Sequence, residues 1–162
     1  GIPTVLSFGK VIANGATNVI PDEVYIEGTF RTMDEDWRTK AHQKIKEIAK
    51  GLAKSMGAKA EINIKVGYPV LINDDRVTQK AIKAAKQFIG NNNVVDLDFR
   101  MTSEDFAYYS QIKPSVFYRL GTATTEGFDC SPLHSANFNI DEKALETGTG
   151  TMAYLAIQFL NQ

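Results

Sequence analysis

The sequence lacks features that several protein classes require. Its single cysteine, Cys130, cannot form an internal disulfide, which favours a reducing compartment, and we expect a cytoplasmic protein. No apolar run approaches the roughly 20 residues of a membrane-spanning helix. The net charge of −1 gives no electrostatic reason to expect binding to nucleic acid or to a membrane. What remains is an ordinary globular composition, with 43% hydrophobic and 23% charged residues.

Signatures of common catalytic sites are also missing. There are two histidines, and neither an H-x-x-x-H motif nor a paired-cysteine spacing for zinc occurs. No G-x-S-x-G motif is present for a nucleophilic serine. The glycine-rich segment 148–150 lacks the lysine of a phosphate-binding loop and does not follow a strand, so we expect it to allow close helix packing instead.

The first part of the chain has the pattern of a small sheet with one helix. Alternating apolar and polar residues predict strands over residues 5–12, 24–31 and 58–66. An apolar stripe predicts a helix that begins at Asp34 or Asp36 and ends at Gly57. The order strand, strand, helix, strand is that of a partial ferredoxin-like βαββαβ unit without its first strand and helix.

The second part alternates helices and strands. We predict helices from Asp75 to Gly90, over 103–111 and from about Asp141 to Phe159, with strands over 94–99 and 116–120. Thr102 and Asp105 have the spacing of a capping box for the short helix. This order is typical of a mostly parallel α/β sheet, and two strands are too few for one. We therefore expect an α/β protein of which this half is the end of a larger layer.

His134 is the main candidate for chemistry, because its loop, residues 131–142, leads directly into the last helix. It could be a metal ligand, a general base, or a loop histidine that hydrogen-bonds the backbone. Since a zinc site needs three or four ligands, His134 could supply at most one of them. Cys130, Ser131 and Ser135 flank it, but adjacency in sequence does not make a catalytic triad. We expect the other histidine, His42, to be solvated among lysines.

Asn18 and Arg31 form a second candidate pair. We expect Asn18 in the loop before the second strand and Arg31 near the far end of that strand, on the polar face of the sheet. An amide and a guanidinium that converge on one surface would suit a carboxylate or an oxyanion. Alternatively, Arg31 pairs with Asp34 or Glu35 and Asn18 satisfies a turn. The acidic residues of segment 103–106 stand at a helix start, where the helix dipole is a sufficient explanation for them.

Taken in order, these segments resemble the dinuclear zinc aminoacylase and carboxypeptidase family, metallopeptidase family twenty. The resemblance includes the "N-V-I-P", "G-T-x-R", "S-E-D-F" and "L-H-S-x-x-F-x-x-D-E" elements of the acylase branch, which contains hippurate and indole-acetyl-amino-acid hydrolases. These elements, with the strand that ends at Gly121, lie in residues 15–22, 28–32, 102–106, 114–121 and 133–142.

The resemblance implies a fold, a reaction and residue roles. Residues 1–68 would be an incomplete ferredoxin-like lid that forms homodimers, and residues 69–162 the C-terminal segment of a zinc-exopeptidase-like α/β catalytic domain. His134 would bind one of two divalent metals, zinc or else manganese or cobalt. Asn18 would polarise the scissile carbonyl or the substrate carboxylate, and Arg31 and Gly121 would bind the carboxylate.

The family's N-terminal metal-binding half, including its catalytic glutamate, has no counterpart in the sequence. We therefore expect a fragment of an N-acyl-amino-acid amidohydrolase that is inactive and holds no metal tightly on its own. Two alternatives remain: a dipeptidase or carboxypeptidase of the same family, and a non-catalytic dimerisation or ligand-binding module.

Overall fold

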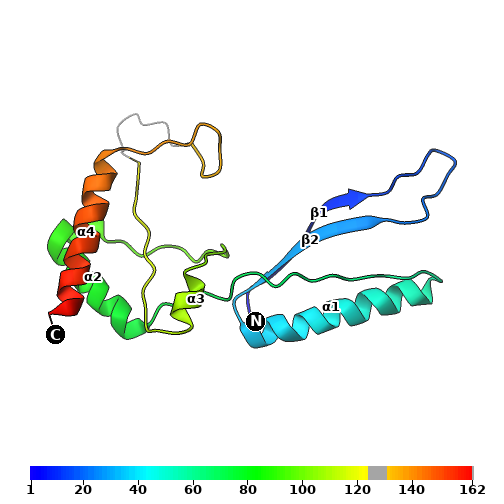
Figure 1. Cartoon of the computed structure of the whole chain (residues 1–162), viewed down its shortest axis with the longest axis horizontal. Coiled ribbons are helices and arrows are strands. Elements are labelled where there is room, and N and C mark those ends of the chain that lie inside the picture. The colour runs from blue at the N-terminus through cyan, green and yellow to red at the C-terminus, as the bar shows by residue number, and fades with distance from the viewer. Residues whose placement is uncertain (124–130, 162) are drawn as a thin grey trace. The chain divides into compact units, whose positions relative to one another are not determined.

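The computed structural model describes residues 1–123 and 131–161, which form two compact units. The first comprises Gly1–Val70 together with Phe99–Ala107, and the second comprises Leu71–Asp98 and Tyr108–Gln162. Figure 1 labels the helices and strands of both. Within the described part of the chain, every helix is too short or too polar to cross a membrane.

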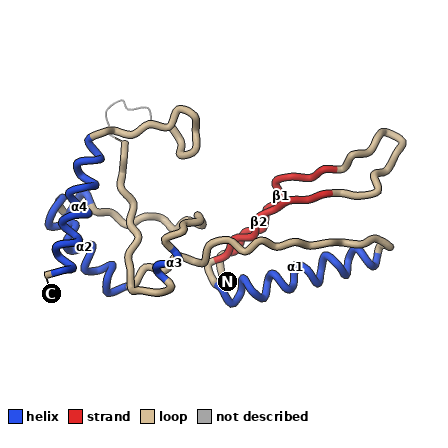
Figure 2. The backbone as a smooth tube through the Cα atoms, viewed as in Figure 1, coloured by secondary structure: helices blue, strands red, loops and turns tan. Residues whose placement is uncertain are grey.

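A two-stranded antiparallel hairpin is the sheet of the first unit. The strands β1 (Thr4–Ile12) and β2 (Tyr25–Thr32) pair from Thr4 opposite Thr32 to Ile12 opposite Tyr25, and Figure 2 shows them in red. A register shift between Phe8 and Lys10 leaves Gly9 as an extra residue on β1, as in a β-bulge. Both strands were predicted from their alternating pattern, and both predictions are confirmed.

Helix α1 (Glu35–Ser55) follows β2 and has clear signals at both ends. The Asp34 carboxylate accepts a hydrogen bond from the backbone N–H of Trp37 at 2.6 Å, which caps the first turn. At the other end Gly57 has a φ of 74°, in the left-handed region that favours glycine. The N–H groups of Gly57 and Ala58 then donate to the carbonyls of Lys54 and Ala53, as in a Schellman motif. The predicted ends of this helix are confirmed.

The start of α1 packs on one end of the hairpin. Thr32 is buried, and its hydroxyl lies 3.2 Å from that of Thr4, which in turn accepts a hydrogen bond from the indole of Trp37. Ala41 is also buried. Farther along, Leu52 on the helix and Phe8 on the hairpin are 61% and 66% exposed. The apolar side chains are therefore covered most completely where the helix begins.

The predicted strand over residues 58–66 is not formed. The segment is not paired with any strand among the described residues, because the two-stranded sheet contains only β1 and β2. Its end is fixed on α1, where Arg38 donates to the Tyr68 carbonyl and Glu35 accepts from the Val70 N–H, both at 2.8 Å. Alternation gave the segment a suitable pattern, but a strand also needs a partner backbone.

Two helices make the core of the second unit. Helix α2 (Asp75–Ile89) begins at Asp75 and ends at Gly90, as predicted. Asp74 caps its first turn, and a 3₁₀ turn, η1 (Asn91–Asn93), follows it. Helix α4 (Lys143–Leu160) packs on α2, with Ala81, Ala84 and Leu155 buried between them. A Cβ on Gly150 would lie 2.8 Å from the Phe88 ring, which confirms that segment 148–150 permits close packing.

The second unit lacks both predicted strands, over residues 94–99 and 116–120, in its described part. The chain at 115–117 is nevertheless fixed to the start of α2. The backbone N–H of Asp74 donates to the Ser115 carbonyl at 2.9 Å. The side-chain amide of Asn73 exchanges two hydrogen bonds with the backbone of Phe117. The described residues therefore contain no parallel sheet, because these segments have no strand beside them with which to form a ladder.

The predicted short helix over 103–111 is reduced to α3 (Ala107–Ser110), a single turn. The turn before it is closed by Glu104, whose carbonyl accepts from the Ala107 N–H at 3.2 Å. The Glu104 carboxylate also accepts from the Phe106 N–H at 3.3 Å. Glu104 thus helps to close the turn that precedes α3.

Candidate functional site

Asn18 lies at the tip of the loop that joins β1 to β2. Ala16 and Val19 exchange backbone hydrogen bonds of 3.0 and 3.1 Å, so Thr17 and Asn18 form a tight turn between them. Gly15 is needed for this turn, because a Cβ there would meet the Val19 carbonyl oxygen at 2.6 Å. The Asn18 side chain is exposed, and the loop geometry presents it outward to solvent.

Arg31 lies at the opposite end of the hairpin from this loop. It pairs with Val5, six residues along β2 from Tyr25, where the connecting loop ends, and six strand residues span about 20 Å. Figure 1 shows the loop at the end of the hairpin that lies away from the start of α1. The expectation that Asn18 and Arg31 of one chain converge on a single group is therefore wrong. Asn18 is in the connecting loop, whereas Arg31 is near the far end of β2.

The Arg31 guanidinium meets two neutral acceptors. Its Nη1 donates to the Met101 carbonyl at 3.4 Å and to the Ser103 hydroxyl at 3.3 Å. The alternative partners, Asp34 and Glu35, are bound elsewhere, Asp34 to the N–H of Trp37 and Glu35 to Arg38 and Val70. Among the described residues no carboxylate forms an ion pair with Arg31. Its positive charge is therefore available to an anionic ligand.

Gly121 stands at the base of the loop that carries His134. It is exposed, and a Cβ at this position would meet no atom within 4 Å, so local packing does not require a glycine here. The next residue, Thr122, accepts a hydrogen bond from the Asp141 N–H at 2.8 Å. This bond brings the two ends of the loop together immediately before α4. Cys130, which was considered as a nucleophile, lies outside the described residues.

His134 has an uncommon backbone conformation. Its φ of 68° is the positive value of a left-handed residue, and it is the one non-glycine residue of this kind in ranges 1–123 and 131–161. A turn holds it there, in which the Ser135 N–H donates to the Pro132 carbonyl at 3.1 Å. The imidazole is exposed, and neither Ser131 nor Ser135 hydrogen-bonds it in the described structure. The turn thus presents the imidazole outward.

A divalent metal would find one candidate ligand here. In the described ranges, no group of three or more histidine, cysteine, aspartate or glutamate side chains could hold a metal ion. The imidazole of His134 suits zinc chemically, but the described residues do not complete a site around it.

His42 differs from its predicted environment. It is partly buried on α1, with its ring 6.0 Å from that of Phe30 in an edge-to-face arrangement. Burial lowers the pKa of His42, and the positive charges of Arg38 and Lys46 lower it further. His42 therefore packs against the hairpin on one side and is only partly solvated.

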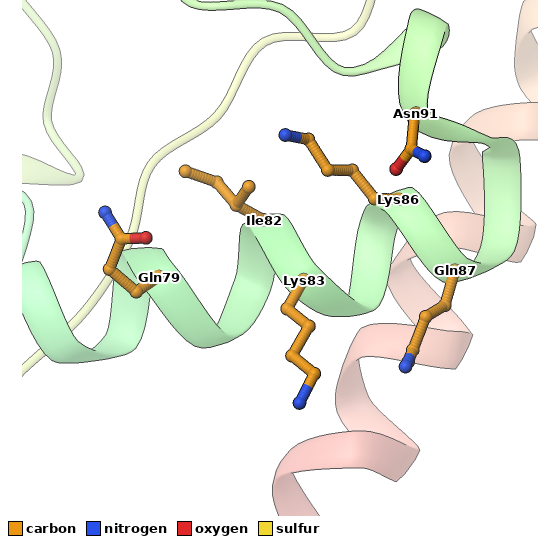
Figure 3. A pocket seen from close by; sticks show the side chains of 6 residues that line it. All are labelled: Gln79, Ile82, Lys83, Lys86, Gln87 and Asn91. Atoms are coloured by element: carbon orange, nitrogen blue, oxygen red, sulfur yellow. The ribbon is translucent and has the colours of Figure 1, made fainter.

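A shallow hollow lies on the exposed side of α2, and Figure 3 shows its side chains along the helix. It contains two lysines and no histidine or carboxylate, and it shares no residue with the predicted site. Its lining is Gln79, Ile82, Lys83, Lys86, Gln87 and Asn91.

The sequence profile described as peptidase family M20/M25/M40 matches residues 2–158, and the chain belongs to this family. It is 30% identical over 161 residues to thermostable carboxypeptidase 2 of Saccharolobus solfataricus, covering 99% of this chain and 40% of the relative. It is 30% identical over 158 residues to hippurate hydrolase of Campylobacter jejuni, covering 96% of this chain and 40% of the relative.

The fold has a counterpart among solved structures. A crystal structure of the Bacillus subtilis protein YXEP, described as a dinuclear metal-binding peptidase of the M20 family, matches with a TM-score of 0.78 and 32% identity. The match covers 95% of this chain and 41% of that one. The chain thus spans about two fifths of the length of these relatives.

Proposed function

We propose that this chain is part of a metal-dependent amidohydrolase that cleaves the amide bond of N-acyl-amino acids. Membership of the M20 family supports hydrolysis of an amide or peptide bond. The choice of N-acyl-amino acids as the substrate class rests on the environment of Arg31. Its hydrogen-bond acceptors are neutral, and it has no ion-pair partner among the described residues. A guanidinium in this state suits the free carboxylate that an N-acyl-amino acid offers.

In this proposal, residues 1–68 are part of a ferredoxin-like lid and residues 69–162 the C-terminal segment of a zinc-exopeptidase-like catalytic domain. His134 binds one metal, Gly121 lines the carboxylate pocket with its backbone, and Asn18 polarises a carbonyl or carboxylate oxygen. The chemistry that a divalent pair such as zinc supplies is polarisation of the scissile carbonyl and activation of water. The catalytic base and the other ligands come from outside these 162 residues, so the isolated chain is inactive.

The complete protein is proposed to dimerise through its lid. The apolar side chains that remain exposed on the hairpin and α1 support this, among them Phe8, Ile26 and Leu52, which are 66%, 54% and 61% exposed. Exposed apolar side chains, where they gather in one patch, commonly mark an interface. The separation of Asn18 from Arg31 also supports it, because two copies could bring one residue of each kind to the same substrate.

A substrate panel tests the activity. The complete protein, supplied with zinc, manganese or cobalt, should hydrolyse N-acyl-amino acids faster than dipeptides, and a chelator should abolish the reaction. A preference for dipeptides or for peptides with a free C-terminus would favour the carboxypeptidase alternative, which the Saccharolobus relative's name supports for that protein. No hydrolysis of either class with any of these metals would refute the proposal and favour a non-catalytic module.

A further inference from the structure

Arg31 and Ser103 are 72 residues apart in sequence, yet they meet in the first unit. The strand β2 ends at Thr32, so Arg31 is near its last position, and its side chain extends to the backbone and hydroxyl of segment 101–103. Segment Phe99–Ala107 is part of the same compact unit as the hairpin. The position of the guanidinium is thus set by a segment that is remote in sequence.

The segment is itself firmly held. Ala107 is completely buried, and the Glu104 carbonyl and carboxylate accept hydrogen bonds from the N–H groups of Ala107 and Phe106. Ser103 directly precedes this closed turn, which holds its backbone beside Arg31. A long, exposed arginine side chain would otherwise sample many rotamers, and ordering it costs conformational entropy.

Both acceptors engage the same nitrogen, Nη1. The Met101 carbonyl and the Ser103 hydroxyl are neutral, so they orient the guanidinium without cancelling its charge. The N–H groups on Nη2 and Nε lie on one edge of the planar fork, and this edge can bind a carboxylate through two parallel hydrogen bonds. An acidic residue at position 103 would instead compete with such a ligand.

From this geometry we infer that Ser103 is a positioning residue for Arg31, and that it sets the preference for substrates with a free carboxylate. This inference rests on the proposed function of Arg31 in carboxylate binding. Ser103 acts through the guanidinium and does not itself contact the substrate.

The test compares two substrates of the complete, metal-supplied protein: the best N-acyl-amino acid and its carboxamide, which lacks the negative charge. Ser103→Ala should raise KM for the carboxylate about five- to tenfold with little change in kcat, since one hydrogen bond to a charged group is lost. The carboxamide should be unaffected. Ser103→Thr, which keeps the hydroxyl, should restore KM, and Ser7→Ala on the same hairpin is the matched control.

An Arg31→Ala background makes the test specific. There, Ser103→Ala should have no further effect on KM. Equal losses for carboxylate and carboxamide, an unchanged KM, or a full additional loss in the Arg31→Ala background would each overturn the inference.

If the wild-type protein hydrolyses nothing in the panel, the proposed function has failed, and the contact is tested separately by a double-mutant cycle on the free energy of unfolding. Additive effects of Arg31→Ala and Ser103→Ala would then refute the positioning of Arg31 by Ser103, whereas a coupled pair would support it.

Discussion

Phe8 on β1 lies against Gly28 on β2, and its ring occupies the space that a side chain at position 28 would need. A Cβ on Gly28 would stand 2.8 Å from Cδ1 of Phe8 and 2.5 Å from the Ser7 carbonyl oxygen. The two residues are direct partners in the register of the hairpin. The aromatic ring thus covers the one position of β2 that offers no side chain.

We predict that Gly28→Ala destabilises the hairpin. The Ser7 oxygen belongs to the backbone and cannot move without disturbing the ladder, so overpacking should cost about 1–3 kcal/mol. Gly9→Ala is the matched control, because a Cβ on Gly9 meets no atom within 4 Å. Thermal unfolding of the two variants of the complete protein measures the difference. Equal melting temperatures would contradict this account of Gly28.

A second stability prediction concerns the contact between α2 and α4. Gly150→Ala would place a Cβ 2.8 and 3.0 Å from two atoms of the Phe88 ring, which is stacked on Tyr154 at a centroid distance of 5.1 Å. Moving the half-exposed ring away would weaken this stacking, and we expect that cost to exceed the gain in helix propensity, so the variant should unfold at a lower temperature. Gly51→Ala in α1 has open space and should gain up to about 1 kcal/mol from helix propensity. A Gly150→Ala variant more stable than the wild type would show that α2 and α4 can move apart at little cost.

How far the sequence predicts this fold depends on the range of the interactions involved. The ends of α1 and α2 were predicted correctly because Asp34, Asp74 and Gly57 act on backbone groups within a few residues. The strands over 58–66, 94–99 and 116–120 were wrong because alternation describes one segment, whereas a ladder depends on a second one. A pattern of side chains cannot specify the partner that supplies the hydrogen bonds.

The candidate site shows the same division. Asn18 was predicted in the loop before the second strand and Arg31 near the far end of that strand, but alternation does not give the register with β1 that fixes their separation. The contact of Arg31 with Ser103 had no signal in the sequence, because 72 residues separate the two. The left-handed conformation of His134 was equally unpredicted, since it results from the turn that Pro132 and Ser135 close.

Mixing two inactive variants tests whether Asn18 and Arg31 of different copies serve one substrate. Because about 20 Å of strand separates Arg31 from the loop end of β2, each substrate should take Arg31 from one copy and Asn18 from the other. In a symmetric dimer, re-associated Asn18→Ala and Arg31→Ala chains should then recover about a quarter of the wild-type rate. The separate variants should have little activity.

No recovery, despite mixed dimers shown by native mass spectrometry, would mean that both residues act from the same copy.

The pH dependence of stability should include a contribution from His42. Burial, followed by Arg38 and Lys46, lowers its pKa in the folded protein, so the unfolded chain binds a proton more readily. The free energy of unfolding should therefore fall as the pH drops below the unfolded pKa of about 6.5. The His42→Gln variant should lack this contribution to the pH dependence. An NMR titration should show His42 titrating below the model-peptide value. A raised pKa would refute this environment.

The last prediction concerns His134 as a metal ligand in the complete protein. His134→Asn removes the imidazole while keeping a residue that tolerates a positive φ, so the turn should survive. Loss of one ligand should lower metal content and reduce activity more than about 100-fold. The metal bound per chain, measured by atomic emission, separates this from a folding defect, and His42→Gln is the control that should retain its metal. If His134→Asn keeps full metal content and turnover, another residue binds the metal and the presentation of His134 by its turn has a different purpose.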